Sequence, residues 1–78
     1  MRVWPNPCAG GLLHVALDPA PADGVRAEVF TLTGQRLAHY RLTGATTTLD
    51  LGGSLSPGTY LLHVPTDGAD HVRRIVIP

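Results

Sequence analysis

Lysine is absent from this sequence, and all six of its basic residues other than histidine are arginines. These arginines are scattered, with only Arg73 and Arg74 adjacent, and six acidic residues bring the formal net charge to zero. Proteins that bind nucleic acid present a basic face interleaved with aromatic rings. The charge pattern therefore argues against a nucleic-acid partner.

Cysteine is almost absent as well, since Cys8 is the only one, so the chain can form neither an internal disulfide nor a thiolate cluster for zinc. We interpret Cys8 as a small packed residue, because a cysteine nucleophile also needs a histidine positioned in a cleft. The four histidines fall on four different predicted strands without metal-site spacing: His14, His39, His63 and His71. We predict neither a metal nor a cofactor.

Long hydrophobic runs and dense charge are also missing. The chain is 44% hydrophobic and 15% charged, which is too apolar for a disordered tail, and no run approaches the roughly 18 residues that span a bilayer. A chain of 78 residues forms one domain that buries about 60% of its unfolded surface, so we predict a thin core without a deep substrate cleft. No apolar segment of an export signal follows Met1, and we expect any such signal to lie in a longer precursor.

What the sequence does contain is alternation of apolar and polar residues with a period of two, as in half-buried strands. Segments rich in proline and glycine separate these runs, and Gly34 provides the positive φ of a short hairpin turn. The sequence predicts an all-β fold, an Ig-like β-sandwich of about seven short antiparallel strands. The clearest runs are 13–17, 25–29, 37–42, 47–51, 60–64 and 71–77.

The last run alternates so that Val72, Arg74 and Val76 share one side, while Arg73, Ile75 and Ile77 share the other. Two roles stay open, and both can hold. Either Ile75, Val76 and Ile77 close the core, or a partner pairs with the backbone of this edge strand and binds its arginines. A free strand edge also predicts a weak homodimer formed by strand addition.

Two shorter motifs have mainly structural interpretations. In Pro5-Asn6-Pro7 the prolines fix φ, and we expect Asn6 to hydrogen-bond the local backbone and set the angle at which the first strand enters the sheet. We expect Asp50 to face solvent or to cap a turn, because a catalytic role would need a second carboxylate or a histidine at a fixed distance.

The order of the motifs resembles the type A C-terminal sorting domain of the type IX (Por) secretion system of Bacteroidetes-like bacteria. The resemblance covers nearly the whole chain, although Thr31 replaces a frequent Asp or Asn and arginines replace lysines near the end. It rests on Trp4-Pro5-Asn6-Pro7, Phe30, Gly34-Gln35-Arg36, Leu49-Asp50-Leu51, Gly58-Thr59-Tyr60 and Arg73-Arg74-Ile75-Val76-Ile77.

This resemblance implies a non-catalytic delivery signal, fused to the C-terminus of a larger exported cargo protein. Cargo would cross into the periplasm by the Sec route, pass the type IX translocon in the outer membrane, and be cleaved from the domain upstream and attached to the cell surface, or released. The candidate residues for translocon recognition are Arg73, Arg74, Ile75, Val76 and Ile77. The structural residues of the family motifs are Pro5, Asn6, Pro7, Gly34, Asp50, Gly58 and Tyr60.

Two other classes of function compete with sorting. A small carbohydrate-binding or adhesive module of a secreted enzyme would expose two or three coplanar aromatic rings, and this chain has only Trp4, Phe30, Tyr40 and Tyr60, several of them needed in the core. An enzyme would need a nucleophile and a base, whereas Ser54 and Ser56 lie in a turn-like segment with no adjacent histidine.

Overall fold

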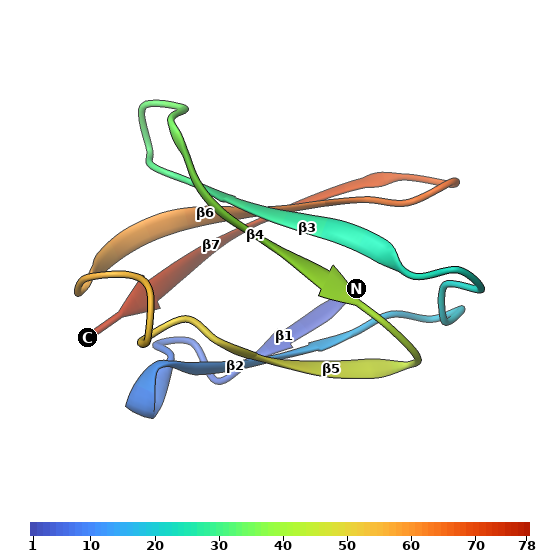
Figure 1. Cartoon of the computed structure of the whole chain (residues 1–78), viewed down its shortest axis with the longest axis horizontal. Helices are drawn as coiled ribbons and strands as arrows, with labels where there is room; N and C mark the ends of the chain where they lie inside the picture. Colours follow the sequence, from blue (N-terminus) through green and yellow to red (C-terminus); the bar gives the residue numbers. More distant parts are fainter.

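The computed structural model describes residues 1–78 and consists of seven strands and one short 3₁₀ turn (Figure 1). None of its segments is a helix of the length and apolar character needed to cross a membrane. The elements are β1 (Arg2–Trp4), η1 (Ala9–Gly11), β2 (Leu12–Ala16), β3 (Val25–Phe30), β4 (Arg36–Leu42), β5 (Thr46–Asp50), β6 (Gly58–Pro65) and β7 (Asp70–Ile77).

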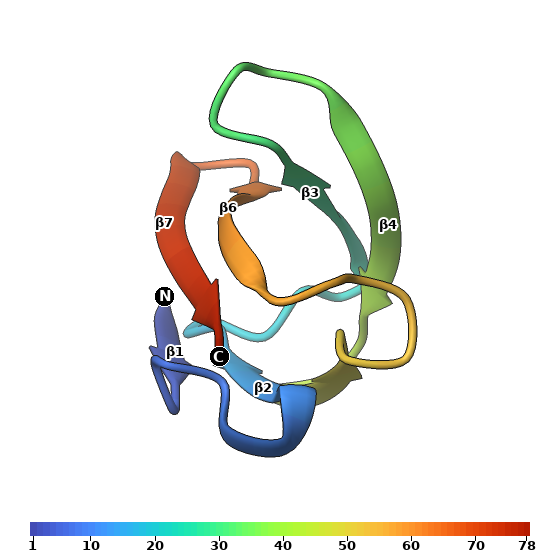
Figure 2. The ribbon, with the colours of Figure 1, turned by 90° about the vertical axis from the view of Figure 1, so that its left-hand side faces the viewer.

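The strands form two sheets in which every pairing is antiparallel. The smaller sheet has the order β1-β2-β5, and the larger has the order β4-β3-β6-β7. The sheets pack face to face, with β1 and β7 along one side of the sandwich and β4 along the other (Figure 2). The predicted all-β sandwich of seven antiparallel strands is confirmed.

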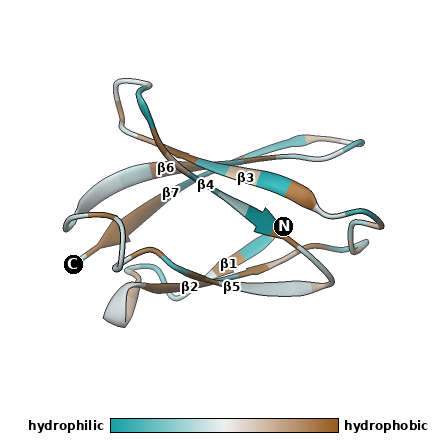
Figure 3. Ribbon diagram, viewed as in Figure 1, coloured by the Kyte–Doolittle hydropathy of each residue, from teal (hydrophilic) through white to brown (hydrophobic).

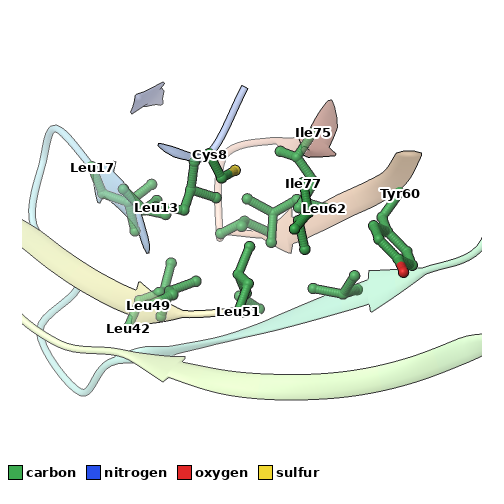
Figure 4. Packing of buried hydrophobic residues seen from close by; sticks show 14 residues of the cluster. Cys8, Leu13, Leu17, Leu42, Leu49, Leu51, Tyr60, Leu62, Ile75 and Ile77 are labelled. Carbon is green, nitrogen blue, oxygen red and sulfur yellow. The ribbon is translucent and has the colours of Figure 1, made fainter. Parts of the chain in front are cut away.

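The core lies between the two sheets and follows the predicted alternation, so Val29 and Leu62 are fully buried. The last three residues of β7 are apolar, and Ile75 and Ile77 among them close the core at one end (Figure 3). The side chains interdigitate in one layer (Figure 4). The buried cluster comprises Cys8, Leu13, Val15, Leu17, Ala27, Val29, Leu42, Leu49, Leu51, Tyr60, Leu62, Val64, Ile75 and Ile77.

Strand β1 has only three residues, too few for an alternating pattern to show, so the sequence does not predict it. The pairing of β3 with β4 contains a bulge, because Val29 pairs with Ala38 and Phe30 pairs with Arg36. Leu37 is the extra residue of β4 at this bulge, and it is 41% exposed. The remaining strand ends lie within two residues of the predicted runs.

Two glycines are required by the local backbone. Gly34 has φ +100° in the β3–β4 turn, the positive value that the sequence predicts. Its N–H donates to the carbonyl of Thr31. Gly11 has φ +77° and approaches Gly52 so closely that a Cβ at position 11 would lie 2.6 Å from the Gly52 Cα. The carbonyl of Gly11 accepts hydrogen bonds from the N–H groups of Leu51 and Gly52.

Candidate functional site

Strand β7 carries all five candidate recognition residues and is an edge strand of the larger sheet. The structure divides these residues into two groups. Ile75 and Ile77 are buried in the core, whereas Arg73 and Arg74 are exposed and Val76 is half-buried. Only the last three side chains are accessible to a partner in the folded domain.

The backbone of β7 alternates between groups that pair with β6 and groups that face the open edge. The carbonyl of Val76 accepts a hydrogen bond of 2.7 Å from the N–H of Cys8, which lies outside the sheet. Val76 therefore faces the open edge, and by alternation so do Val72 and Arg74. These are the groups that a strand added to β7 would have to reach.

Asn6 occupies this edge. Its Nδ2 donates to the carbonyl of Arg74 at 2.9 Å, and its Oδ1 accepts the N–H of Val76 at 3.1 Å. The side-chain amide thus pairs with β7 as the backbone of a neighbouring strand would. Together with Cys8, it closes the C-terminal half of the edge, from the Arg74 carbonyl to the Val76 carbonyl.

This arrangement corrects the predicted role of Asn6. We expected its side chain to bond the backbone of its own turn, but its partners lie 68 and 70 positions away. Pro5 and Pro7 lack backbone N–H groups, so the residues flanking Asn6 offer its side chain no donor. The side-chain amide instead lies against the open edge of β7. There the Arg74 carbonyl and the Val76 N–H are close enough together for one amide group to bond both.

The two adjacent arginines differ in their contacts. Arg73 donates from Nη1 to the Val72 carbonyl at 3.1 Å and from Nη2 to the Met1 carbonyl at 3.4 Å, which links β7 to the start of the chain. The guanidinium of Arg74 makes no hydrogen bond or ion pair. Arg74 is opposite Leu61 in the β6–β7 register, and its side chain is exposed on the outer face of the larger sheet. Arg74 is thus the cation of β7 that is available to a partner.

Cys8 connects the edge to the core. Its side chain is fully buried among leucine and isoleucine side chains (Figure 4). Burial raises the pKa of its thiol, and the backbone hydrogen bond with Val76 lowers it by less. The thiol is neutral at physiological pH and inaccessible, so Cys8 is a packed residue, as predicted.

The other motif residues are turn and corner residues. Asp50 is exposed, and its Oδ1 accepts the N–H of Gly53 at 3.2 Å, which caps the turn after β5. Tyr60 is buried, and its hydroxyl donates to the carbonyl of Ser56 at 2.5 Å. Gly58 starts β6, where a Cβ would touch the Tyr60 ring at ordinary contact distance. These contacts fix the ends of β5 and β6 and do not involve the β7 edge.

The aromatic rings do not share a face. Trp4 lies on the smaller sheet with the Arg2 guanidinium carbon 4.7 Å from its ring centroid and the His14 ring 5.4 Å away. Phe30 lies on the larger sheet, 6.4 Å from the His63 ring. The coplanar platform expected of a carbohydrate-binding module is therefore not formed.

Ionisable side chains do not converge on one place either. No three histidine, cysteine, aspartate or glutamate side chains lie close enough together to hold a metal ion. A hollow of about 620 Å³ opens at one end of the sandwich and contains no aromatic side chain. The segments that line it are Met1, residues 17–25, residues 65–69 and His71.

A comparison with protein families identifies the chain. The model of the secretion system C-terminal sorting domain matches residues 2–78. The chain belongs to this family. No curated protein matches it in a sequence search. The domain is thus a C-terminal sorting signal of type IX secretion, of a kind that is in general not catalytic, and it belongs to a secreted or cell-surface protein that passes the outer membrane.

Sequence reasoning identified the final strand of this sorting domain but missed two backbone groups at its edge. The N–H of Cys8 donates to the Val76 carbonyl of β7, and the carbonyl of Met1 accepts a hydrogen bond from Arg73. No sequence signal marks a backbone group that bonds a strand about 70 positions away. Only the Pro-Asn-Pro motif indicated that this segment has a fixed geometry.

Proposed function

We propose that this domain carries a cargo protein, fused to its N-terminal end, through the type IX translocon, and that the translocon binds the exposed arginines of β7. The observation that supports this most directly is the division within β7. Ile75 and Ile77 anchor the strand in the core, while Arg74 stands on the outer face with no partner in the chain.

Recognition through side chains suits this edge better than strand addition. Asn6 and Cys8 already hold the Arg74 carbonyl and both backbone groups of Val76. An arginine guanidinium forms charge-assisted, often bidentate hydrogen bonds with a carboxylate. The translocon surface that binds here is therefore acidic. Arg73 has the weaker claim, since it is bonded to the carbonyls of Val72 and Met1.

The later steps belong to the same proposal. After Sec-dependent passage into the periplasm and transport across the outer membrane, a surface peptidase would cut upstream of the domain and attach the cargo to lipopolysaccharide, or the cargo would be released.

A secretion assay in a bacterium with type IX machinery tests the proposal. The reporter carries a Sec signal at its N-terminus and residues 1–78 at its C-terminus. Truncation after Val72 would remove Ile75 and Ile77 from the core, so point variants are better suited. Arg74→Glu is compared with Arg2→Glu, which makes the same charge change on the other sheet.

We expect the wild-type fusion to reach the surface or medium, Arg2→Glu to follow it, and Arg74→Glu to accumulate in the periplasm. Retention of the wild-type fusion in the periplasm would contradict the sorting function. Equal secretion of both arginine variants would contradict recognition through Arg74.

A further inference from the structure

The two sides of the sandwich differ in how their strand edges are closed. On the β1–β7 side, Asn6, Cys8 and Arg73 occupy backbone groups of the edge, and Pro5 follows β1 directly. On the opposite side, no hydrogen bond from elsewhere in the chain reaches the outer edge of β4. This strand has seven residues, so its open edge is about 23 Å long.

The alternation of hydrogen bonds across the sheet shows which β4 groups are unpaired. In a strand, the backbone N–H and carbonyl of one residue point to the same side, and those of the next residue point to the other side. Since the backbone groups of Val76 face the open edge of β7, those of Ile75 face β6, and the same reasoning can be followed through each strand pair to β4. The pairs that carry this alternation are Tyr60 with Ile75, Leu61 with Phe30, and Ala27 with Tyr40. Tyr40 thus bonds β3, and the N–H and carbonyl groups of His39 and Arg41 face solvent.

The side chains beside this edge are basic. Arg36, His39 and Arg41 are exposed, and β4 contains no acidic residue. Arg36 is ion-paired with Glu28 at 2.9 Å, and its hydrogen bond holds the pKa of that carboxyl below its usual range. Arg41 has no acidic side-chain partner and stands directly opposite Arg26 in the β3–β4 register. Its Nη2 donates to the Asp23 carbonyl, which leaves the other N–H groups of the guanidinium for a partner. Like charges directly opposite in a sheet are destabilising, which indicates a place for an anionic group.

We propose that the open edge of β4 is a second docking surface of the sorting domain, to which a component of the type IX machinery adds an extended segment with acidic side chains. This inference rests on the proposed function and names a further contact within it. Backbone pairing with His39 and Arg41 would supply affinity, and carboxylates facing Arg41 would supply selectivity. The exposed side chain of Leu37 adds an apolar contact at one end of the edge.

A second copy of this chain fits the edge less well. Pairing of two β4 strands would bring Arg36 and Arg41 of both copies into one ribbon without any acidic residue. Arginines on an edge strand can also serve only to prevent such pairing. The two roles predict different effects of reversing the charge of Arg41.

The secretion reporter described above tests this surface with two variants and two matched controls. His39→Pro removes one outward N–H but no bond to β3, and it is compared with Thr46→Pro on β5. Thr46 also faces outward, because Ala45 and Leu51 bond the β2 side, and its side chain is exposed. Arg41→Glu is compared with Arg2→Glu. Circular dichroism and gel filtration of each purified domain report folding and association.

We expect His39→Pro and Arg41→Glu to lower secretion about tenfold, with both controls close to the wild type. If His39→Pro does not fold, the Arg41 comparison decides. Normal secretion of a folded, monomeric Arg41→Glu domain would overturn the inference, and so would increased self-association without a secretion defect. Failure of the wild-type fusion would instead count against the proposed function.

Discussion

The Oδ1 atom of Asn6 accepts the backbone N–H of Val76 at 3.1 Å, although 70 positions separate the two residues in the sequence. The same side chain donates to the Arg74 carbonyl at 2.9 Å. One amide therefore closes an edge that would otherwise be a template for strand addition. The relationship explains how β7 can lie at the edge of the sheet and still be protected along its C-terminal half.

Replacing Asn6 with alanine should reopen this edge. We expect Asn6→Ala to lower the free energy of unfolding by about 1–2 kcal/mol, since two hydrogen bonds are lost at a site that water can reach. Urea denaturation measures the loss, and sedimentation velocity should show more dimer than for the wild type. Asn6→Asp keeps the acceptor for Val76 but loses the donor to Arg74, so it should fall between the two. An alanine variant as stable and as monomeric as the wild type would contradict the closing role.

The core residues should be sensitive to truncation. Leu62 and Val29 are fully buried, so we expect alanine at either position to cost about 2–4 kcal/mol, which could unfold so small a domain. Leu32 is 59% exposed and provides the control, because Leu32→Ala removes the same atoms from the surface. Thermal unfolding followed by circular dichroism checks the three variants. Equal melting temperatures would show that the inward-facing assignments are wrong.

Gly10 and Gly11 form a matched pair for testing backbone contact. Both have positive φ, +71° and +77°, but a Cβ at Gly10 would meet nothing within 4 Å, whereas one at Gly11 would lie 2.6 Å from the Gly52 Cα. We expect Gly10→Ala to cost about 1 kcal/mol for its backbone conformation. Gly11→Ala should cost about 1–3 kcal/mol more, because the β2 and β5 ends must separate. Urea midpoints that shift equally would refute the close approach.

The two tyrosine hydroxyls should respond in opposite ways to removal. The Tyr40 hydroxyl is buried and makes no hydrogen bond of regular geometry, although the Ser54 side chain lies near it, whereas the Tyr60 hydroxyl donates to the Ser56 carbonyl. Tyr40→Phe should leave stability unchanged or raise it by up to about 1 kcal/mol, since an unsatisfied polar group is removed. Tyr60→Phe should lower it by about 1 kcal/mol. A larger loss for Tyr40→Phe than for Tyr60→Phe in chemical denaturation would reverse this assignment.

Stability should fall at alkaline pH. Burial raises the pKa of the Cys8 thiol above its ordinary value of 9.0, so above that pH the unfolded chain releases this proton while the folded chain keeps it. The unfolded state then binds fewer protons, and the free energy of unfolding decreases as pH rises. Denaturation midpoints between pH 7 and about pH 10.5 measure the slope. Cys8→Ser, whose side chain does not titrate in this range, should show a shallower decrease. If Cys8→Ser and the wild type lost stability equally with rising pH, ionisable groups other than the Cys8 thiol would be responsible.

The sequence determined those parts of the protein that depend on neighbouring residues. Alternation with a period of two identified most of the strands and placed Val29 and Leu62 on the inward face, because successive side chains in a strand point to opposite sides. Gly34 marked its turn because the turn needs a positive φ. The order of the motifs also indicated the family, which the match over residues 2–78 shows.

Only the tertiary structure decided which strand edges are open. The sequence suggested a free edge at the final strand, yet Asn6 and Cys8 close its C-terminal half, while the edge of β4 stays open. Hydrogen bonds within a strand pair follow a local repeat, but the residues that cover an edge come from distant parts of the chain and have no spacing that a sequence pattern could show. Strand order in the two sheets fixed those contacts, and with them the surfaces that a partner can reach.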